Sequence, residues 1–276
     1  MKSIAPSAER APRASPRTAG EALAHLVAAL CRLARQGLAR KERQHDGVHR
    51  VRKAIRSLRA VLALAHETLG EPAAPIDRAL QQLARSLSTL RDAHVAVATA
   101  RSLATGAEKQ AWLDLAARLD TRCEQHLART LAQDPGFAKR RARLARISKA
   151  LAALPWYRVE RRSLEHALVE GELRVAKAER KAKKEMTAQR LHRWRRRVRR
   201  LRMQVDAMRR IEACSKPLWK MQHERAGQLK KRTDLLGRRQ DLEVLAQLLP
   251  QVRDTVNRDA LRRRLQQEIA ALDASA

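Results

Sequence analysis

Hydrophobic residues recur three and four positions apart along most of the chain, which is the spacing of amphipathic α-helices. The first helical pattern starts near Thr18 and runs towards Arg40. A second starts at Asp46, the expected N-cap, and continues to about Thr68. Gly37 interrupts the first pattern with a residue of low helix propensity, so we expect it to cost that helix some stability.

Segments that contain proline or glycine divide the rest of the chain into further expected helices. These span residues 76–104, 107–132, 138–154, 159–185, 188–212 and 216–249, and a last one ends near residue 272. Four helices in each half, joined by short loops, favour an all-α fold of two antiparallel four-helix bundles related by internal duplication. The expected organisation is a basic tail at 1–17, a first bundle at 18–134, a linking basic helix at 135–157 and a second bundle at 158–273.

Two segments that lie 143 residues apart carry the same register of apolar positions. In each, five apolar side chains stand at offsets −1, 2, 6, 9 and 13 from a histidine, which is His49 in the first segment and His192 in the second. On a helical projection these offsets cover about 180° to 260°, which is one continuous face. The first set is Val48, Val51, Ile55, Leu58 and Leu62, and the second is Leu191, Trp194, Val198, Leu201 and Val205. The shared register favours duplication and predicts that both faces belong to the core.

A row of cations runs beside each of these apolar faces. Both segments have Arg at offsets 3, 7 and 10 from the histidine, and with the histidine these positions project to between about 280° and 360°. The first stripe is His49, Arg52, Arg56 and Arg59, and the second stripe is His192, Arg195, Arg199 and Arg202. A solvated face would lie opposite the core rather than beside it. We therefore expect the stripes to line a groove or channel and to be only partly exposed.

Composition supports the helical interpretation and indicates an anionic partner. Aromatic residues make up 2% of the chain, so the core must be built mostly of Leu and Ala, which are good helix formers. The formal net charge is +31, and self-repulsion on that scale destabilises a compact state unless polyanions are nearby. All six non-histidine stripe positions hold Arg, whose guanidinium binds phosphate oxygens in a bidentate manner. His49, expected in the first turn of its helix, adds a ring nitrogen whose pKa an anion would raise.

Cysteine spacing and hydropathy restrict the remaining classes. Cys31, Cys123 and Cys214 lie far apart without C-x-x-C spacing, which predicts buried reduced thiols rather than a disulfide scaffold or a zinc site. No window of about 18 apolar residues occurs, and the N-terminus lacks the apolar segment of a signal peptide, so we expect a cytoplasmic protein without membrane insertion. Composition alone leaves open a transit function for residues 1–17.

Two further motifs complete a pattern that resembles a known family. Residues 91–95 (RDAHV) follow the first stripe, and residues 240–244 (QDLEV) follow the second, each in the third helix expected for its half. Together with the repeated H-x-x-R-x-x-x-R-x-x-R, they resemble CHAD, the conserved-histidine α-helical domain, over most of residues 18–273. The resemblance implies two four-helix bundles about a pseudo-twofold axis, with the basic helices forming a central cavity or surface that binds inorganic polyphosphate.

The resemblance also implies roles for individual residues. By position, the eight residues of the two stripes inherit the phosphate-contacting role. Asp92 and Asp241 match the acidic position of the motif, where we expect them to orient Arg side chains rather than touch the ligand. Additional candidate contacts are Arg196, Arg200, Lys230 and Lys231. This chain departs from the pattern at Ser57, which stands where the second copy has Arg200, so we expect the second half to dominate affinity.

A nucleic-acid-binding protein is the main alternative, because basic helices neutralise any phosphate backbone. The chain has no C2H2 spacing and no ribonucleoprotein motif, and it has too few aromatic residues for a base-stacking platform. Trp194 aligns with Val51 on the apolar face, which favours a core position over stacking. Nonspecific binding of nucleic acid in vitro is nevertheless expected from the charge alone.

A polyphosphate- or triphosphate-processing enzyme, or an accessory to one, is the other alternative. The chain has neither a P-loop nor a cluster of carboxylates to hold a metal for phosphoryl transfer. Residues 170–174 (EGELR) resemble the E-x-E-x-K signature of triphosphate tunnel enzymes, yet that motif belongs on a strand and this segment has a helical pattern. His45 and His49 have the i, i+4 spacing of a metal pair but no evident third ligand. We therefore expect a binding protein without catalytic activity, cofactor or metal, associated with polyphosphate granules in the cytoplasm, whose oligomeric state the sequence leaves open.

Overall fold

The computed structural model describes residues 18–211, 216–253 and 255–274, and within them the fold is all-α, without a strand. The expected tail at 1–17 and Cys214 lie outside the described residues. The helices are α1 (Ala19–Ala39), α2 (Gln44–Leu64), α3 (His66–Arg85), α4 (Ser88–Ser102), α5 (Lys109–Gln133), α6 (Ala138–Ala152), α7 (Arg161–Lys184), α8 (Ala188–Ile211), α9 (Lys216–Leu248) and α10 (Arg258–Ala274). None of the helices in this part of the chain combines the length and the apolar stretch needed to cross a bilayer.

The first two helices begin differently from one another. Thr18 caps α1 with a capping box, because its hydroxyl accepts from the Glu21 amide at 3.2 Å and its own amide donates to the Glu21 carboxylate at 3.0 Å. The prediction that Asp46 caps the second helix is wrong. α2 begins at Gln44, after Arg43 in a left-handed conformation (φ 50°), and Asp46 instead pairs with Arg43 at 2.8 Å within the first turn.

Two glycines explain how α1 and α2 pack so closely. A Cβ atom added to Gly47 would lie 2.4 Å from the carbonyl oxygen of Gly37, and one added to Gly37 would lie 2.7 Å from a methyl group of Val51. These distances are shorter than van der Waals contact. Gly37 therefore has a packing role that offsets its low helix propensity.

The single helix expected at 76–104 is two helices. α3 ends at Arg85, and α4 starts at Ser88 after a turn at Ser86 and Leu87 that contains neither glycine nor proline. The break expected at residues 70–75 is present at Gly70, whose non-helical backbone (φ 48°) separates two helical segments of α3, and the helix resumes before residue 76. Pro72 lies in the first helical turn after Gly70, where backbone amide groups have no helical acceptor, so a proline costs no hydrogen bond there.

The hydrophobic side chains form two cores, and each draws on both halves of the chain. The larger core contains Leu and Val side chains of α1, α2, α3, α6, α7 and α8. The smaller core joins α4 and α5, through residues such as Trp112, to the end of α9 and to α10, through residues such as Leu245 and Leu261. The cores therefore do not divide between residues 134 and 158, as one self-contained bundle per half would require.

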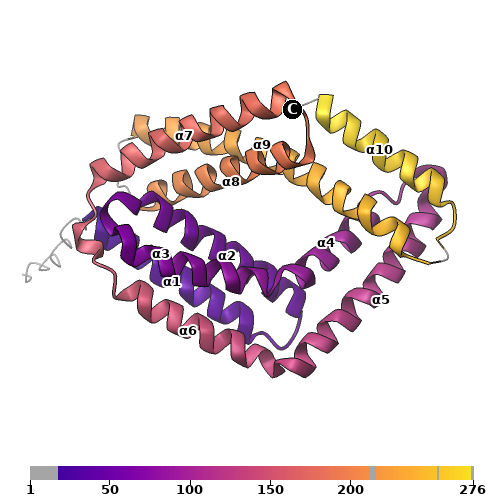
Figure 1. Ribbon diagram of the computed structural model, residues 1–276, viewed down its shortest axis with the longest axis horizontal. Coiled ribbons are helices and arrows are strands. Elements are labelled where there is room, and N and C mark those ends of the chain that lie inside the picture. The colour runs from indigo at the N-terminus through magenta and orange to yellow at the C-terminus, as the bar shows by residue number, and fades with distance from the viewer. Residues whose placement is uncertain (1–17, 212–215, 254, 275–276) are drawn as a thin grey trace, which may run out of the picture.

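Figure 1 shows how the helices are arranged around these cores. α1, α2, α3 and α6 lie together on one side, and α7, α8 and α9 run along the opposite side. α4 and α5 extend away from the first group, and α10 packs against α9 at the far end. α2 contacts α8 and α4 contacts α9, so these four helices connect the two halves of the chain.

Both predicted apolar registers are buried. Every one of the ten aligned positions has 3% or less of its surface exposed, from Val48 to Leu62 in α2 and from Leu191 to Val205 in α8. Trp194 is 2% exposed, which confirms its place in the core and removes it as a base-stacking side chain. The faces that flank the two stripes are thus the faces by which α2 and α8 enter the core.

Candidate anion-binding site

α2 and α8 pack against each other and bring arginines of the two stripes together. A cavity of about 470 Å³ lies between them. Arg56 and Arg59 line it from α2, and His192 and Arg199 line it from α8. Arg196 and Arg200, the additional candidates on α8, line it too, as do Arg193 and Arg197, which the sequence argument did not select. Seven of the eleven residues that line the cavity are therefore arginines, and none is a carboxylate.

Several of these guanidinium groups have no partner among the described residues. Arg56, Arg196 and Arg199 form no hydrogen bond or ion pair within that part of the chain. The Nε atom of Arg56 is buried without an acceptor, as are those of Arg52 and Arg195. Leaving a buried donor unsatisfied costs about 1–3 kcal/mol, and more for a charged group. A bound anion would supply the acceptors that the protein does not.

Crowding of like charges perturbs the arginines nearest the centre. Burial, followed by the charges of Arg52 and Arg91, lowers the pKa of Arg56 to about 10. Burial, followed by the charges of Arg56 and Arg195, lowers the pKa of Arg199 to about 9. Arg56 of the first stripe and Arg199 of the second thus repel each other, yet both stay cationic at neutral pH. Anion binding would relieve this repulsion.

Other stripe residues have partners inside the protein. Arg59 donates to both carboxylate oxygens of Asp77, at 2.7 Å to Oδ1 and 2.9 Å to Oδ2. Arg52 donates through Nη1 to the carbonyl oxygen of Ala84. Arg202 has two longer ion pairs, at 3.9 Å to Asp206 and 3.8 Å to Asp234. These three arginines therefore contribute charge to the site while anchoring α2 and α8 to neighbouring helices.

The two stripe histidines are exposed, and each lies in the second turn of its helix. His49 was expected in the first turn, but α2 starts two residues before the predicted N-cap. Partial burial of the ring lowers the pKa of His49 below its usual value although the residue reaches the surface, and the charges of Arg56 and Arg91 lower it further, so the ring is neutral at pH 7. His192 Nδ1 lies 3.0 Å from Oε1 of Gln240, and its ring lines the cavity.

Arg91 of α4 is a member of the cluster that sequence reasoning missed. It donates to Asp92 at 3.0 Å and to Asp241 of α9 at 3.4 Å. Its charge acts on Arg56 and Arg199, so both motif aspartates hold a cation of the same cluster. Arg195 is 9% exposed, and the charge of Asp241 offsets part of the burial that lowers its pKa. Arg91 is the first residue of the RDAHV motif, so that motif could have identified Arg91 as a member of the cluster.

Lys230 and Lys231 lie outside the cavity. Both are exposed on α9, and neither lines the space between α2 and α8. Ser57 lines a different hollow, which α1, α2 and α8 form around Lys53 and Asp206. Ser57 and Arg200 therefore do not occupy equivalent places towards the cavity, although they are equivalent in the sequence register.

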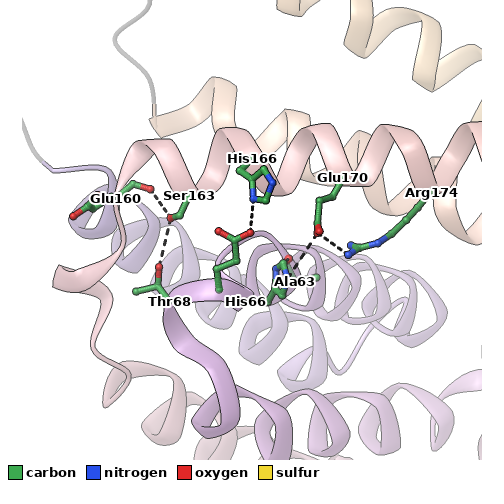
Figure 2. Close-up of polar contacts among 9 residues, drawn as sticks. Ala63, His66, Thr68, Glu160, Ser163, His166, Glu170 and Arg174 are labelled. Atoms are coloured by element: carbon green, nitrogen blue, oxygen red, sulfur yellow. Dashed lines mark hydrogen bonds and ion pairs between the residues drawn. The ribbon is translucent and has the colours of Figure 1, made fainter.

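A separate polar cluster joins α3 to α7 (Figure 2). His166 Nδ1 lies 2.6 Å from a carboxylate oxygen of Glu67, and Ser163 lies 3.4 Å from Thr68. Glu170 accepts from Arg174 at 2.6 Å, one helical turn away on α7. The EGELR segment is thus helical, and this part of it serves a surface ion pair, unlike the strand position of the tunnel-enzyme signature.

Comparison with known proteins gives two findings. The sequence profile described as CHAD domain matches residues 17–250. A crystal structure of the CHAD domain from the plant Ricinus communis is similar to this chain with a TM-score of 0.66 and 19% sequence identity, covering 99% of this chain and 91% of that one. Comparison with curated proteins gave no match.

Proposed function

The chain belongs to the CHAD-domain family, and we propose that it binds inorganic polyphosphate in the cationic cavity between α2 and α8. One observation carries the proposal: Arg56, Arg196 and Arg199 meet at this cavity without a carboxylate partner in the described residues. Most arginines that stabilise a fold have acceptors, as Arg59 does in Asp77. Three unpaired guanidinium groups at one cavity indicate a ligand that brings several anionic groups at once.

The spacing of the cations favours a polyanion over a single anion. Each stripe extends ten residues, or about 15 Å along its helix. A chain of phosphates can place successive negative groups along that length, and each phosphate can accept two hydrogen bonds from one guanidinium. Such a ligand would pair the cations of both helices and remove the repulsion between them.

The role of Asp92 and Asp241 in this proposal is to position cations. Both hold Arg91, and Asp241 also attracts Arg195. As carboxylates they would repel phosphate if they faced it directly. Their pairing with Arg91 offsets the charge of that arginine, so Arg56, Arg196 and Arg199 are among the cations of the cavity that lack a carboxylate partner in the described residues.

We also infer that the two halves arose by duplication. α1, α2, α4 and α5 pack in sequence order, and α7, α8, α9 and α10 do the same. The most extensive contacts of α2 and α4 with the second half are α2 with α8 and α4 with α9, which join corresponding members of the two sets, and α1 with α8 and α2 with α7 are a reciprocal pair of further contacts. This pattern supports a pseudo-twofold relation, with the cationic cavity beside the α2–α8 contact and with α3 and α6 as extra helices of the first half.

Nucleic-acid binding remains the second candidate because exposed cations also lie away from the cavity. Lys230 and Lys231 are examples, and a duplex would contact such surface charges without entering the cavity. We propose that binding of this kind is nonspecific. The protein is further proposed to be a non-enzymatic binding module of the cytoplasm that associates with polyphosphate granules.

The affinities for two polyanions test the proposed function. The full chain is titrated with polyphosphate of defined length and with duplex DNA of matched charge at several salt concentrations. The proposal predicts tighter binding of polyphosphate at every salt concentration, because the cavity admits a flexible phosphate chain and excludes a duplex. Equal affinity at matched charge would contradict it. Steady phosphate release in the presence of Mg²⁺ would contradict the non-enzymatic role.

A further inference from the structure

Two histidines and a cysteine that are far apart in the sequence meet where the two cores adjoin. His45 lies in the first turn of α2, His94 lies on α4, and Cys123 lies on α5 with its side chain in the smaller core. Their possible ligand atoms all lie within 4.8 Å of one another. The two imidazole rings stack with their centroids 4.9 Å apart and their planes 6° from parallel. Cys123 Sγ lies 3.8 Å from Nδ1 and 3.7 Å from Nε2 of His45.

We propose that His45, His94 and Cys123 bind a zinc ion. One thiolate and two imidazoles form a donor set that suits Zn²⁺, whereas Mg²⁺ and Ca²⁺ prefer oxygen ligands. Zinc bond lengths of about 2.0 Å to nitrogen and 2.3 Å to sulfur place tetrahedral ligand atoms about 3.3–3.6 Å apart. The cluster therefore has to contract by roughly 1 Å, which side-chain rotation can supply without moving a helix.

A neighbouring carboxylate already orients one of the ligands. Glu124 Oε1 lies 3.0 Å from Nε2 of His45, so this nitrogen carries the proton and donates to Glu124. That leaves Nδ1 of His45 available to the metal. A carboxylate that accepts from the outer nitrogen of a metal-bound histidine is a recurring feature of zinc sites, because it fixes the tautomer and raises the basicity of the ring.

Three carboxylates lie around this cluster, in a chain whose formal net charge is +31. The carboxylates of Asp46 and Asp120 are close enough to act on the charge of His94, and the carboxylate of Glu124 lies 3.0 Å from His45. Two of these carboxylates are held in place by arginines, Asp46 by Arg43 at 2.8 Å and Asp120 by Arg101 at 2.7 Å. A divalent cation thus meets less repulsion here than at the cavity between the stripes.

A zinc ion at this position would connect helices that belong to different cores. α2 packs in the larger core, and the segment of α5 around Cys123 packs in the smaller one. His45 is one helical turn before His49, and His94 is three residues after Arg91. The ion would fix α4 and α5 against the start of α2, at one end of the cationic cluster. The fourth zinc position would be left for water or an exogenous ligand.

Cobalt substitution tests the site on the full chain, reduced and stripped of metal. Titration with Co²⁺ should give a thiolate-to-cobalt charge-transfer band and tetrahedral d–d bands that saturate at one equivalent, and Zn²⁺ should bleach them. C123S should abolish the charge-transfer band, and H94Q should weaken Co²⁺ binding at least about tenfold, in line with loss of a metal ligand.

C31S is the matched control because Cys31 is also a buried thiol, but it lies in the larger core outside this cluster. C31S should retain the complete spectrum, and Cys214 is present in both cysteine variants. Far-UV circular dichroism checks that C123S is folded, and thermal unfolding with and without Zn²⁺ gives an independent readout, because Zn²⁺ should stabilise wild type and C31S but not C123S. No band in the wild-type protein, or an undiminished band in folded C123S, would overturn the proposal. Neither result depends on whether the cavity binds polyphosphate.

Discussion

Individual arginines at the cavity between α2 and α8 are of two kinds. Arg59 is paired through both oxygens of Asp77 and therefore contributes to the packing of α3 on α2. Arg56 and Arg199 have no such partner in the described residues, and their pKa values are lowered to about 10 and about 9. The sequence register places Arg56 and Arg199 at the same offset from their histidines and Arg59 three residues further along the first stripe, so it does not distinguish paired from unpaired arginines. A bound phosphate would give Arg56 and Arg199 the hydrogen-bond acceptors that they lack, whereas Arg59 already has Asp77 as its acceptor.

His49 gives a prediction about pH. Its pKa is lowered by burial and by neighbouring cations, and a bound polyanion would raise it again. Binding should therefore take up a proton between the pKa of the free protein and that of the complex. Affinity for polyphosphate should increase as the pH falls through this window. In H49Q the increase should be smaller, as measured by dissociation constants at pH 7.5, 6.5 and 5.5 at constant ionic strength.

The same histidine affects stability with a definite sign. Because its folded pKa lies below the ordinary value of about 6.5, the unfolded state binds more protons as the pH falls through that range. His49 therefore removes stability from the free protein below about pH 6.5.

The affinity prediction has a contrary outcome. Identical pH profiles of polyphosphate affinity for wild type and H49Q would show that His49 does not respond to the ligand.

At the scale of elements, the contact between α1 and α2 depends on Gly37 and Gly47. The Gly47→Ala substitution places a methyl group 2.4 Å from the Gly37 carbonyl oxygen, a backbone atom that cannot rotate away. We expect this overpacking to lower the free energy of unfolding by about 1–3 kcal/mol. Urea denaturation measures the free energy of unfolding of this variant, which is compared with that of the Gly227→Ala variant.

Gly227 is the matched control, since it is exposed on α9 and an added Cβ would have no heavy atom within 4 Å. The Gly227→Ala substitution should raise the free energy of unfolding by up to about 1 kcal/mol through helix propensity. Equal effects of the two substitutions would mean that α1 and α2 do not approach each other as closely as described.

Helix positions and the buried faces could be predicted from the sequence because they depend on local periodicity. α8 starts at the predicted residue, and both apolar registers are buried. The turn at Ser86 and Leu87 was missed because it contains no helix-breaking residue. The left-handed conformation of Arg43 is set by the reversal between α1 and α2, which no propensity of arginine indicates.

The candidate sites likewise include one that could be predicted from local spacing and one that depends on how the helices pack. The stripes could be found because each lies on one helix, at a spacing that the sequence displays. Whether they face each other, and which of their arginines gain a partner such as Asp77, depends on how helices pack. The cluster of His45, His94 and Cys123 could not be found from spacing at all, because its members are brought together by three helices and span 78 residues.

At the scale of the whole molecule, the two cores each combine both halves of the chain, and the cationic cavity lies between helices of different halves. The net charge of +31 is therefore not spread evenly over an inert surface. Part of it is concentrated at an internal boundary, where it destabilises the free protein and is available to a polyanion. Binding and stability should consequently oppose each other at these positions.

The most direct measurement compares two double substitutions that remove the same formal charge. R56Q/R199Q removes two unpaired cations of the cavity, one from each stripe, and K230Q/K231Q removes exposed cations of α9 outside it. Hydrogen bonds to charged groups contribute about 1.5–3 kcal/mol each, so R56Q/R199Q should lose at least about tenfold in polyphosphate affinity. Its free form should be as stable as wild type or more so, because the repulsion is gone. K230Q/K231Q should stay within about twofold of wild-type affinity, because salt screens the general effect of exposed charges. Equal losses for the two variants would contradict the account, because net charge rather than the cavity would then determine binding.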